Sequence, residues 1–323
     1  MKKCLTIFVC LLSALFFAAC QKQDTSVSKT GFYFDTVIKV TLYDADAKPE
    51  LESCFALADK YEKLLSATKK GSDIWNINHA KGKPVVVSKE TISLLQKAID
   101  YSERSDGAFD ITIGELSSLW DFGENKDTVP SQKDINAALP TVDYHNIEIS
   151  DNTVTLKNPK TQIDLGGIAK GYLSQKLVEL FQKEGAVAGV VSLGGNVQTF
   201  GKKEDGSRFT IGITDPSDGQ SVLGTLEVDE KAVITSGSYQ RYFEENGKRY
   251  HHIMDPRTGA PAESDLLSVT VICDRGEQGD ALATSLFVMG KEKAIAYAKE
   301  NDLSLILVDQ NNEIWTSEGV DFR

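Results

Sequence analysis

The sequence has few cysteines and histidines, and they are not grouped as metal ligands. Its 323 residues include 5 cysteines and 4 histidines. No Cys-x-x-Cys pair and no Cys/His group with zinc-ligand spacing occurs, which excludes a zinc site of that type. Cys54 and Cys273 lie beyond the N-terminal segment. They are either a disulfide pair of an oxidising compartment or two buried free thiols.

The chain also lacks a basic patch, an internal repeat and an interior linker. Its formal net charge is −12 at pH 7, so we expect no nucleic-acid partner. Hydrophobic residues make up 41% and charged residues 25% of the chain, which are ordinary proportions for a globular protein. Because the chain after the N-terminal segment contains no internal repeat and no linker, we expect residues 30–323 to form one catalytic unit.

Long hydrophobic runs are absent apart from one at the N-terminus. Two lysines precede an apolar run over residues 5–19, and small residues stand directly before Cys20. A membrane-spanning helix needs about 20 apolar residues, and this run is shorter. The layout is typical of a secretory signal and resembles the leader of bacterial lipoproteins. We therefore expect a signal peptide at 1–19, a lipid on Cys20, a polar tether at 20–29, and a bacterial, extracytoplasmic protein anchored to the cell membrane.

Hydrophobic periodicity predicts an α+β fold with mixed, largely antiparallel sheets and flanking helices. Strands are expected at 32–43, 84–87, 162–165, 187–193, 208–213, 222–228, 232–235 and 266–272, with a meander at 147–163 and hairpins at 239–253 and 303–316. Helices are expected at 49–65, 88–105, from 131, from 167 to 185, at 279–289 and at 291–301, and a loop at 66–79. Ser88 and Ser131 are the expected N-caps of their helices.

The segment Asp164-Leu165-Gly166-Gly167-Ile168-Ala169-Lys170-Gly171 is the most informative stretch. Two glycines at the start of a helix let backbone N–H groups approach a ligand, and the helix start carries partial positive charge. Lys170 adds a full positive charge, and Asp164 is an acceptor beside it. The segment therefore suits an anionic ligand such as a nucleotide. Glycine pairs also end strands for purely structural reasons, and the local sequence leaves both readings open.

Asp280 and Thr284 are four residues apart on an expected helix start and therefore share a face. A carboxylate and a hydroxyl are hard oxygen donors that suit Mg²⁺ when the substrate supplies phosphate oxygens. The structural alternative is a helix N-terminal charge and a hydrogen-bonded core hydroxyl.

Two adjacent histidines precede a turn signature, Asp-Pro-Arg-Thr-Gly at 255–259. On a strand, His251 and His252 point to opposite faces, so they cannot share a metal. One of them could act as a general base near neutral pH, and the inward one could be a hydrogen-bonded core side chain.

Four further stretches are less specific. The second glycine pair, in 192–196, and the hydroxyl-rich 235–238 would let a phosphate approach backbone donors. Residues 106–110 and 120–123 combine aromatic and small residues that could stack a planar ring, although such aromatics are more often core.

The order of these stretches is more specific than any one of them. They are FDTV from residue 34, SDI…N at 72–78, DGAFDIT at 106–112, LWDFG at 119–123, DLGGIAKGY at 164–172, SLGGN at 192–196, TSGSYQRYF at 235–243, YHHIMDPRTG at 250–259 and DALATSLFVMG at 280–290. Together they resemble the ApbE family of FAD:protein FMN transferases over nearly all of residues 30–316. The lipoprotein-like leader fits the same family.

The resemblance implies an ApbE-like fold and Mg²⁺-dependent transfer of FMN from FAD to a threonine or serine of an acceptor flavoprotein, with release of AMP. The acceptor would be a membrane redox subunit or an exported flavoprotein. The family pattern assigns metal binding to Gly167, Asp280 and Thr284, and FAD binding to Ala108, Phe109, Asp110, Asp164, Lys170 and Met254. It makes His252 the candidate base, with Asp280 also counted as catalytic. Ala283 stands where many members carry an acidic residue.

Two alternatives share the same site. With water as the nucleophile, the protein would be a Mg²⁺-dependent FAD pyrophosphatase that yields FMN and AMP. Without turnover, it would be an FAD-binding lipoprotein. Paired metal donors argue against the second, because binding alone does not require them.

Overall fold

The computed structural model describes residues 26–43, 48–122 and 128–323. The predicted signal peptide and Cys20 lie outside these ranges. Across the described ranges, no helix combines the length and the apolar character that crossing a membrane requires.

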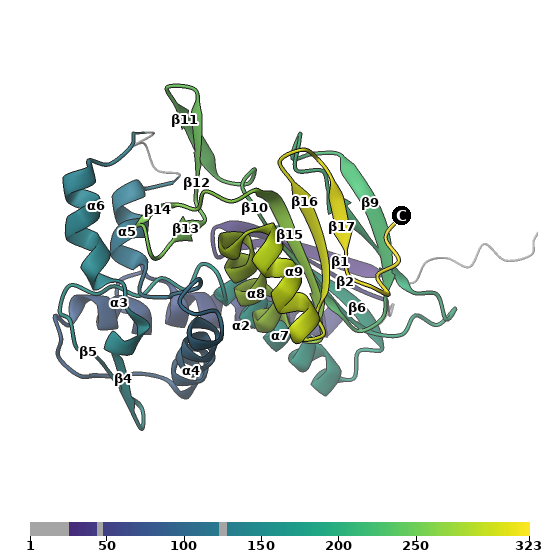
Figure 1. Cartoon of the computed structure of the whole chain (residues 1–323). Coiled ribbons are helices and arrows are strands. Elements are labelled where there is room, and N and C mark those ends of the chain that lie inside the picture. The colour runs from purple at the N-terminus through teal and green to yellow at the C-terminus, as the bar shows by residue number, and fades with distance from the viewer. Residues whose placement is uncertain (1–25, 44–47, 123–127) are drawn as a thin grey trace, which may run out of the picture.

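One eight-stranded antiparallel sheet forms the frame of the molecule (Figure 1). Its strand order is β1-β2-β6-β7-β10-β15-β16-β17. The strands are β1 Val27–Tyr33, β2 Thr36–Leu42, β6 Ala188–Leu193, β7 Asn196–Gly201, β10 Ala232–Gly237, β15 Leu266–Cys273, β16 Ser304–Asp309 and β17 Ile314–Thr316. Every neighbouring pair is antiparallel, so the predicted α+β class is confirmed.

Helices pack on one face of this sheet, and a two-stranded sheet packs on the other. The helices are α2 Lys48–Leu65, α7 Ala169–Glu184, α8 Gly276–Met289 and α9 Lys291–Glu300. The α8 helix contacts both β10 and β15, and α7 lies between α2 and α8. On the opposite face, strands β8 Phe209–Thr214 and β9 Val222–Val228 bury Phe209 and Ile211 against Val233 and Ile306.

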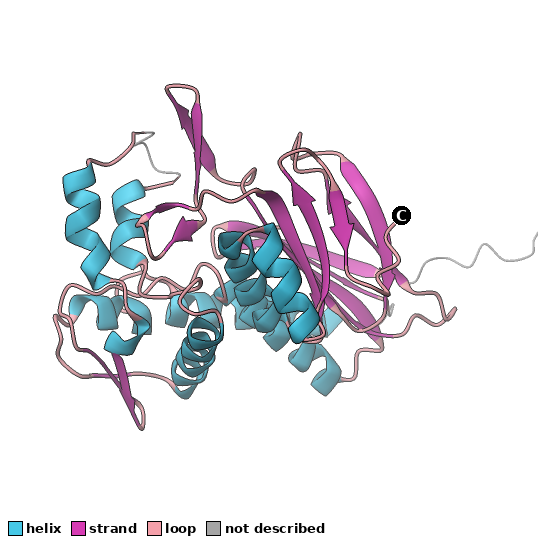
Figure 2. Ribbon diagram, in the orientation of Figure 1, coloured by secondary structure: helices cyan, strands magenta, loops and turns pink. Residues whose placement is uncertain are grey.

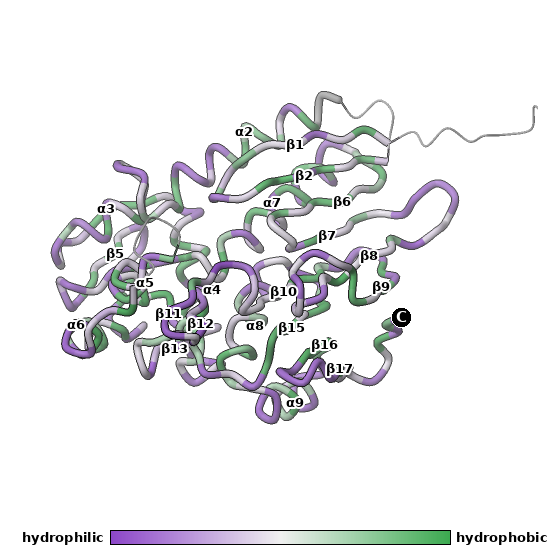
Figure 3. The backbone as a smooth tube through the Cα atoms, turned by 90° about the horizontal axis from the view of Figure 1, so that it is seen from above, coloured by the Kyte–Doolittle hydropathy of each residue, from purple (hydrophilic) through white to green (hydrophobic). Residues whose placement is uncertain are grey.

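A second, mainly helical region lies beside the sheet (Figure 2). It contains α3 Asp73–His79, α4 Lys89–Arg104, α5 Gly114–Trp120 and α6 Gln132–Ala138, with the short strands β3 Val85–Val86, β4 Ile147–Ser150 and β5 Thr153–Leu156. The hairpin β11 Tyr242–Glu245 and β12 Lys248–His251, followed by β13 Met254–Asp255 and β14 Ala260–Pro261, lies between the two regions. Hydrophilic residues gather in outer loops such as the one between β7 and β8 (Figure 3).

Local sequence signals for helix and turn positions are confirmed. Ser88 and Ser131 cap α4 and α6 by accepting from Thr91 N and Asp134 N. Gly185 ends α7 in the left-handed conformation. Asn246-Gly247 and Asp151-Asn152 form the predicted hairpin turns.

Several predicted boundaries are wrong. Residues 32–43 are not one strand, because Phe34 and Asp35 both adopt left-handed φ of 54° and turn the chain between β1 and β2. The β1 strand begins at Val27, so the last residues of the predicted 20–29 tether belong to the fold. The predicted loop at 66–79 contains α3, which Ser72 caps.

Two further predictions at 147–201 are corrected. Instead of a strand at 162–165, Gln162 makes a single parallel bridge to Ile113. The meander ends at Leu156. The chain also turns back directly after the second glycine pair to form β7, which the sequence reading missed.

The two described cysteines are free thiols, so the disulfide alternative is wrong. Cys54 and Cys273 lie in different hydrophobic clusters. Each thiol donates to a backbone carbonyl, Leu51 O and Arg275 O respectively. Burial raises the pKa of both thiols to about 12, which keeps them protonated and unreactive at neutral pH.

Candidate active site

The first turns of α7 and α8 meet through two glycines. A Cβ on Gly171 would lie 2.2 Å from the carbonyl oxygen of Gly276, and a Cβ on Gly276 would lie 2.2 Å from that of Gly171. These positions tolerate only glycine because the opposing atoms are backbone. The contact therefore brings together the N-terminal ends of two helices that are far apart in the sequence.

Asp280 lies at this junction, in the second turn of α8 rather than at the helix start as predicted. It is buried, with 3% of its surface exposed. Gly171 N donates to Oδ2 at 2.9 Å, and Asn196 Nδ2 donates to Oδ1 at 2.9 Å. The carboxylate is therefore held from two sides, and each oxygen keeps capacity for a further partner.

Thr284 lies one turn further along α8, against the first glycine pair. A Cβ on Gly167 would lie 3.3 Å from Thr284 Oγ1 and 3.0 Å from the Phe109 ring. Thr284 Oγ1 also lies 3.3 Å from Ser236 Oγ at the end of β10. The structure thus brings together three predicted site residues and one hydroxyl, Ser236, from the hydroxyl-rich 235–238.

The turn before α7 is organised around Gly166. Asp164 Oδ1 accepts from Gly166 N at 2.8 Å, and Lys170 Nζ donates to Gly166 O at 2.9 Å. The N-cap residue of α7, Ile168, makes no side-chain cap hydrogen bond. In the first turn, Ala169 N donates to Leu165 O and Gly171 N donates to Asp280 Oδ2. The partial positive charge of the helix start, beside a lysine, favours an anion.

The two histidines have different surroundings, as their strand position predicted. His251 is buried: Nε2 lies 3.1 Å from Ala262 O, and the ring packs edge-on against Phe287. It is the hydrogen-bonded core histidine of the structural alternative, and burial lowers its pKa to about 4. His252 follows β12 and is half-buried.

The surroundings of His252 include the carbonyl of Arg241 and the positive charge of Lys170. Its Nδ1 lies 3.3 Å from Arg241 O. Because a carbonyl only accepts, Nδ1 carries the proton and Nε2 keeps the lone pair. Burial, reinforced by the positive charge of Lys170, lowers the pKa of His252 to about 3. The imidazole is therefore neutral at pH 7.

The remaining predicted FAD contacts are buried, and their roles stay predictions. Asp110 Oδ1 accepts from Thr112 N and Oγ1, and Oδ2 accepts from Tyr144 N. Burial raises the pKa of this carboxyl. These contacts tie the carboxylate to the 106–112 loop and to Tyr144, and Oδ2 keeps capacity for a further partner. Ala108 packs in the cluster that includes α8 residues, and Met254 packs with Trp120 and Phe243.

The donor set suits Mg²⁺ better than a soft metal. In the described part of the chain, no three acidic, histidine or cysteine side chains group as ligands. Ala283, at the family's frequent acidic position, is fully buried. One carboxylate, one hydroxyl and a nearby backbone carbonyl are hard donors, and Mg²⁺ is typically held by few protein carboxylates together with substrate phosphates and water.

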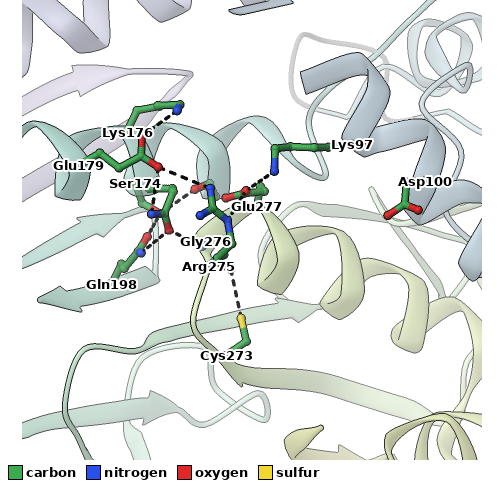
Figure 4. A network of polar contacts seen from close by, with 12 residues as sticks. Lys97, Asp100, Ser174, Lys176, Glu179, Gln198, Cys273, Arg275, Gly276 and Glu277 are labelled. Atoms are coloured by element: carbon green, nitrogen blue, oxygen red, sulfur yellow. Dashed lines mark hydrogen bonds and ion pairs between the residues drawn. The ribbon is translucent and has the colours of Figure 1, made fainter. Parts of the chain in front are cut away.

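A network of polar contacts, with Glu277 buried at its centre, fixes the start of α8 (Figure 4). Glu277 has no exposed surface and accepts from Arg275 Nε at 2.8 Å, and Lys97 Nζ lies 2.9 Å from the same oxygen. Burial alone would raise the pKa of Glu277, but these cations hold it below its ordinary value. Next to it, Gln198 Nε2 donates to Gln175 Oε1, which also accepts from Gly276 N.

Sequence reasoning missed the contacts of Asn196, which lies in the SLGGN motif, and of Glu277 and Ser236. The sequence did contain a signal for Asn196. A polar residue at the start of a buried strand needs a hydrogen-bond partner, because its side chain is removed from water when the strand packs.

Comparison with known proteins agrees with this geometry. A model of the ApbE family matches residues 34–307. The chain belongs to the ApbE family. Among curated relatives, an FAD:protein FMN transferase of Klebsiella pneumoniae (strain 342) is 38% identical over 80% of this chain and 82% of its own. An FAD:protein FMN transferase of Treponema pallidum (strain Nichols) is 34% identical over 91% of this chain and 87% of its own.

Solved ApbE structures have the same fold. The ApbE protein of Thermotoga maritima MSB8 superposes with a TM-score of 0.85 at 34% identity, covering 91% of this chain and 97% of that one. The flavin transferase ApbE of Vibrio cholerae superposes with a TM-score of 0.83 at 30% identity, and also covers 91% of this chain and 97% of its own. The ApbE resemblance of the motifs is therefore confirmed.

Proposed function

We propose that this chain transfers FMN from FAD to a threonine or serine hydroxyl of an acceptor flavoprotein and releases AMP. Curated relatives over most of the chain carry the name FAD:protein FMN transferase, and a solved relative is named a flavin transferase. The observation that carries the proposal is the junction itself. Asp280 of α8 accepts from Gly171 N in the first turn of α7, and Thr284 lies against Gly167 just before that helix.

We propose further that Mg²⁺ is held by the Asp280 carboxylate, the Thr284 hydroxyl and the carbonyl of Gly167. A bound Mg²⁺ would neutralise negative charge on the FAD diphosphate and on the leaving AMP phosphate. The partial positive charge of the α7 start and the ammonium of Lys170 add positive potential near this turn. Both features favour a diphosphate at this turn.

His252 is the proposed base for the acceptor hydroxyl. Its Nδ1–H donates to Arg241 O, which fixes the ring and leaves Nε2 available. The acceptor oxygen attacks the phosphorus on the FMN side, the bond from that phosphorus to the bridging oxygen breaks, and AMP leaves with that oxygen. The proton of the hydroxyl passes to Nε2 of His252. Water in place of the acceptor hydroxyl would give FMN and AMP instead.

The proposal is tested by incubating the protein with FAD, Mg²⁺ and a candidate acceptor, and measuring the intact mass of the acceptor. The transferase predicts one FMN added per acceptor and an equal amount of AMP. Free FMN and AMP with an unmodified acceptor would show a pyrophosphatase instead. Bound but unchanged FAD would show a binding protein and contradict catalysis.

We also propose that the mature protein is bacterial, extracytoplasmic and held at the cell membrane by lipid on Cys20, with a membrane redox subunit or an exported flavoprotein as acceptor. Support comes from the leader, whose apolar run ends in small residues and a cysteine. Replacing Cys20→Ala should release the protein from the membrane fraction after cell breakage. Retention of this variant in the membrane fraction would point to an uncleaved anchor.

A further inference from the structure

The second glycine pair forms a tight turn between two strands of the main sheet. Gly194 and Gly195 have φ of 57° and 98°, and Leu193 pairs with Asn196 across them. A Cβ on Gly194 would lie 2.3 Å from Thr36 Oγ1, so glycine is needed for both conformation and space. The sequence suggested that this loop receives a phosphate. Its geometry shows another use, because it fixes where Asn196 begins β7.

Asn196 points from β7 to the carboxylate of Asp280. Its side chain is buried, with 3% exposed, and Nδ2 donates to Oδ1 at 2.9 Å. The other oxygen, Oδ2, accepts from Gly171 N. The two donors come from residues 84 and 109 positions away in the chain. They bind different oxygens and so prevent the carboxylate from rotating about its last side-chain bond.

We propose that Asn196 is a positioning residue that orients Asp280 for a divalent cation. The inference rests on the proposed function, in which Asp280 holds Mg²⁺. A carboxylate offers about four lone-pair sites; the two donors occupy one on each oxygen and leave one on each for the cation. Outer residues that hydrogen-bond a metal ligand typically contribute about 10–100-fold in affinity or activity. A side chain without N–H groups cannot supply this contact.

Gln198 is a matched control on the same strand. It lies two residues further along β7, is equally buried at 2% exposed, and its amide bonds to Gln175 and Ser174 rather than to Asp280. Removing either amide takes hydrogen bonds out of the same interface between β7 and α7–α8. Only the loss of Asn196 releases Asp280.

The experiment measures Mn²⁺ binding to the purified protein by electron paramagnetic resonance of free Mn²⁺, together with the Mg²⁺ and FAD dependence of turnover. For Asn196→Leu, which keeps a similar volume but removes the donor without adding a charge, we expect a Kd for Mn²⁺ raised at least 10-fold and a higher Mg²⁺ requirement. The KM for FAD should change less than threefold. For Gln198→Leu we expect lower thermal stability but a Kd within twofold of the wild type.

Asn196→Ala repeats the measurement with a smaller side chain, in case Asn196→Leu does not fold. A wild-type Kd for Mn²⁺ in either variant would overturn the inference, and so would equal weakening by Gln198→Leu. Mn²⁺ binding that is unaffected by Asp280→Asn would overturn it as well. Failure of the proposed function looks different, since Mn²⁺ would bind and depend on Asn196 while no FMN reached an acceptor.

Discussion

The contact between Gly171 and Gly276 gives the sharpest structural prediction. In Gly171→Ala, the added methyl would lie 2.2 Å from Gly276 O and 2.8 Å from Asp280 Cβ, where ordinary contact begins at 3.4 Å. A backbone carbonyl cannot rotate away as a side chain can. The α7 and α8 helices must therefore separate by about 1 Å, a distance over which misplacement of catalytic groups can cost on the order of 10²-fold in rate.

Two effects on stability oppose each other in this variant. Alanine is favoured over glycine inside a helix by about 1 kcal/mol, while overpacking a tight contact costs about 1–3 kcal/mol. The hydrogen bond from residue 171 N to Asp280 Oδ2 is strained as well. We expect a net decrease in the free energy of unfolding and a loss of FMN transfer of about 10²-fold.

Chemical denaturation and the transfer rate at saturating FAD measure both consequences. Gly212→Ala is the control, because its methyl would lie at ordinary distance, 3.4 Å, from Val222 on an exposed position of β8. The control should keep wild-type stability and rate. If Gly171→Ala transferred FMN at the wild-type rate with the wild-type Mg²⁺ requirement, the helix junction would not be the site.

Three further predictions concern the same region. Asp280→Ala should abolish Mg²⁺-dependent turnover, and unchanged activity of this variant at saturating Mg²⁺ would contradict the assignment of Asp280 as a metal ligand. Thr284→Val should raise the Mg²⁺ concentration needed for turnover, with little effect on folding. His252→Ala should slow transfer by about 10²–10⁴-fold, whereas an effect on FAD affinity alone would make His252 a binding contact. Because the pKa of His252 lies near 3, the rate of the wild-type protein should not decline from protonation of this histidine between pH 7.5 and 5.5. His251 should make folding sensitive to acid, because its pKa is about 4 in the folded protein against 6.5 as a free side chain. As the pH falls from 6.5 to 4, the unfolded chain takes up the proton and the folded protein does not. The free energy of unfolding should therefore fall by about 3 kcal/mol over this interval, at about 1.4 kcal/mol per pH unit. Denaturation curves of His251→Leu should show a smaller loss over that interval, and an identical loss would contradict the assignment.

Local chemistry made parts of the fold predictable from the sequence. Ser88 and Ser131 were recognisable because an N-cap satisfies donors three residues away. Asn246-Gly247 marked its hairpin because both residues tolerate left-handed φ. The turn at Phe34-Asp35 was missed because it contains no glycine, and its conformation is imposed by strand pairing and by the bond from Phe34 N to Glu62 Oε1.

Contacts between distant segments set the limit of sequence reasoning about the site. Spacing alone places Asp280 and Thr284 on one helical face, but it does not show that Gly171 and Asn196 hold the carboxylate. Motif order predicts an FAD contact at Asp110, but it does not show that Thr112 and Tyr144 donate to its carboxylate. Such hydrogen bonds depend on tertiary packing and cannot be read from the order of residues in the sequence.

The location of the cation tests the central claim most directly. Crystals of the protein soaked with FAD and Mn²⁺ can be examined by anomalous diffraction, which locates Mn²⁺ independently of the protein coordinates. The account predicts one strong peak in contact with the Asp280 carboxylate and Thr284 Oγ1, beside the Gly166-Gly167 turn and the FAD diphosphate. A bound flavin whose diphosphate and cation lie away from this helix junction would contradict it.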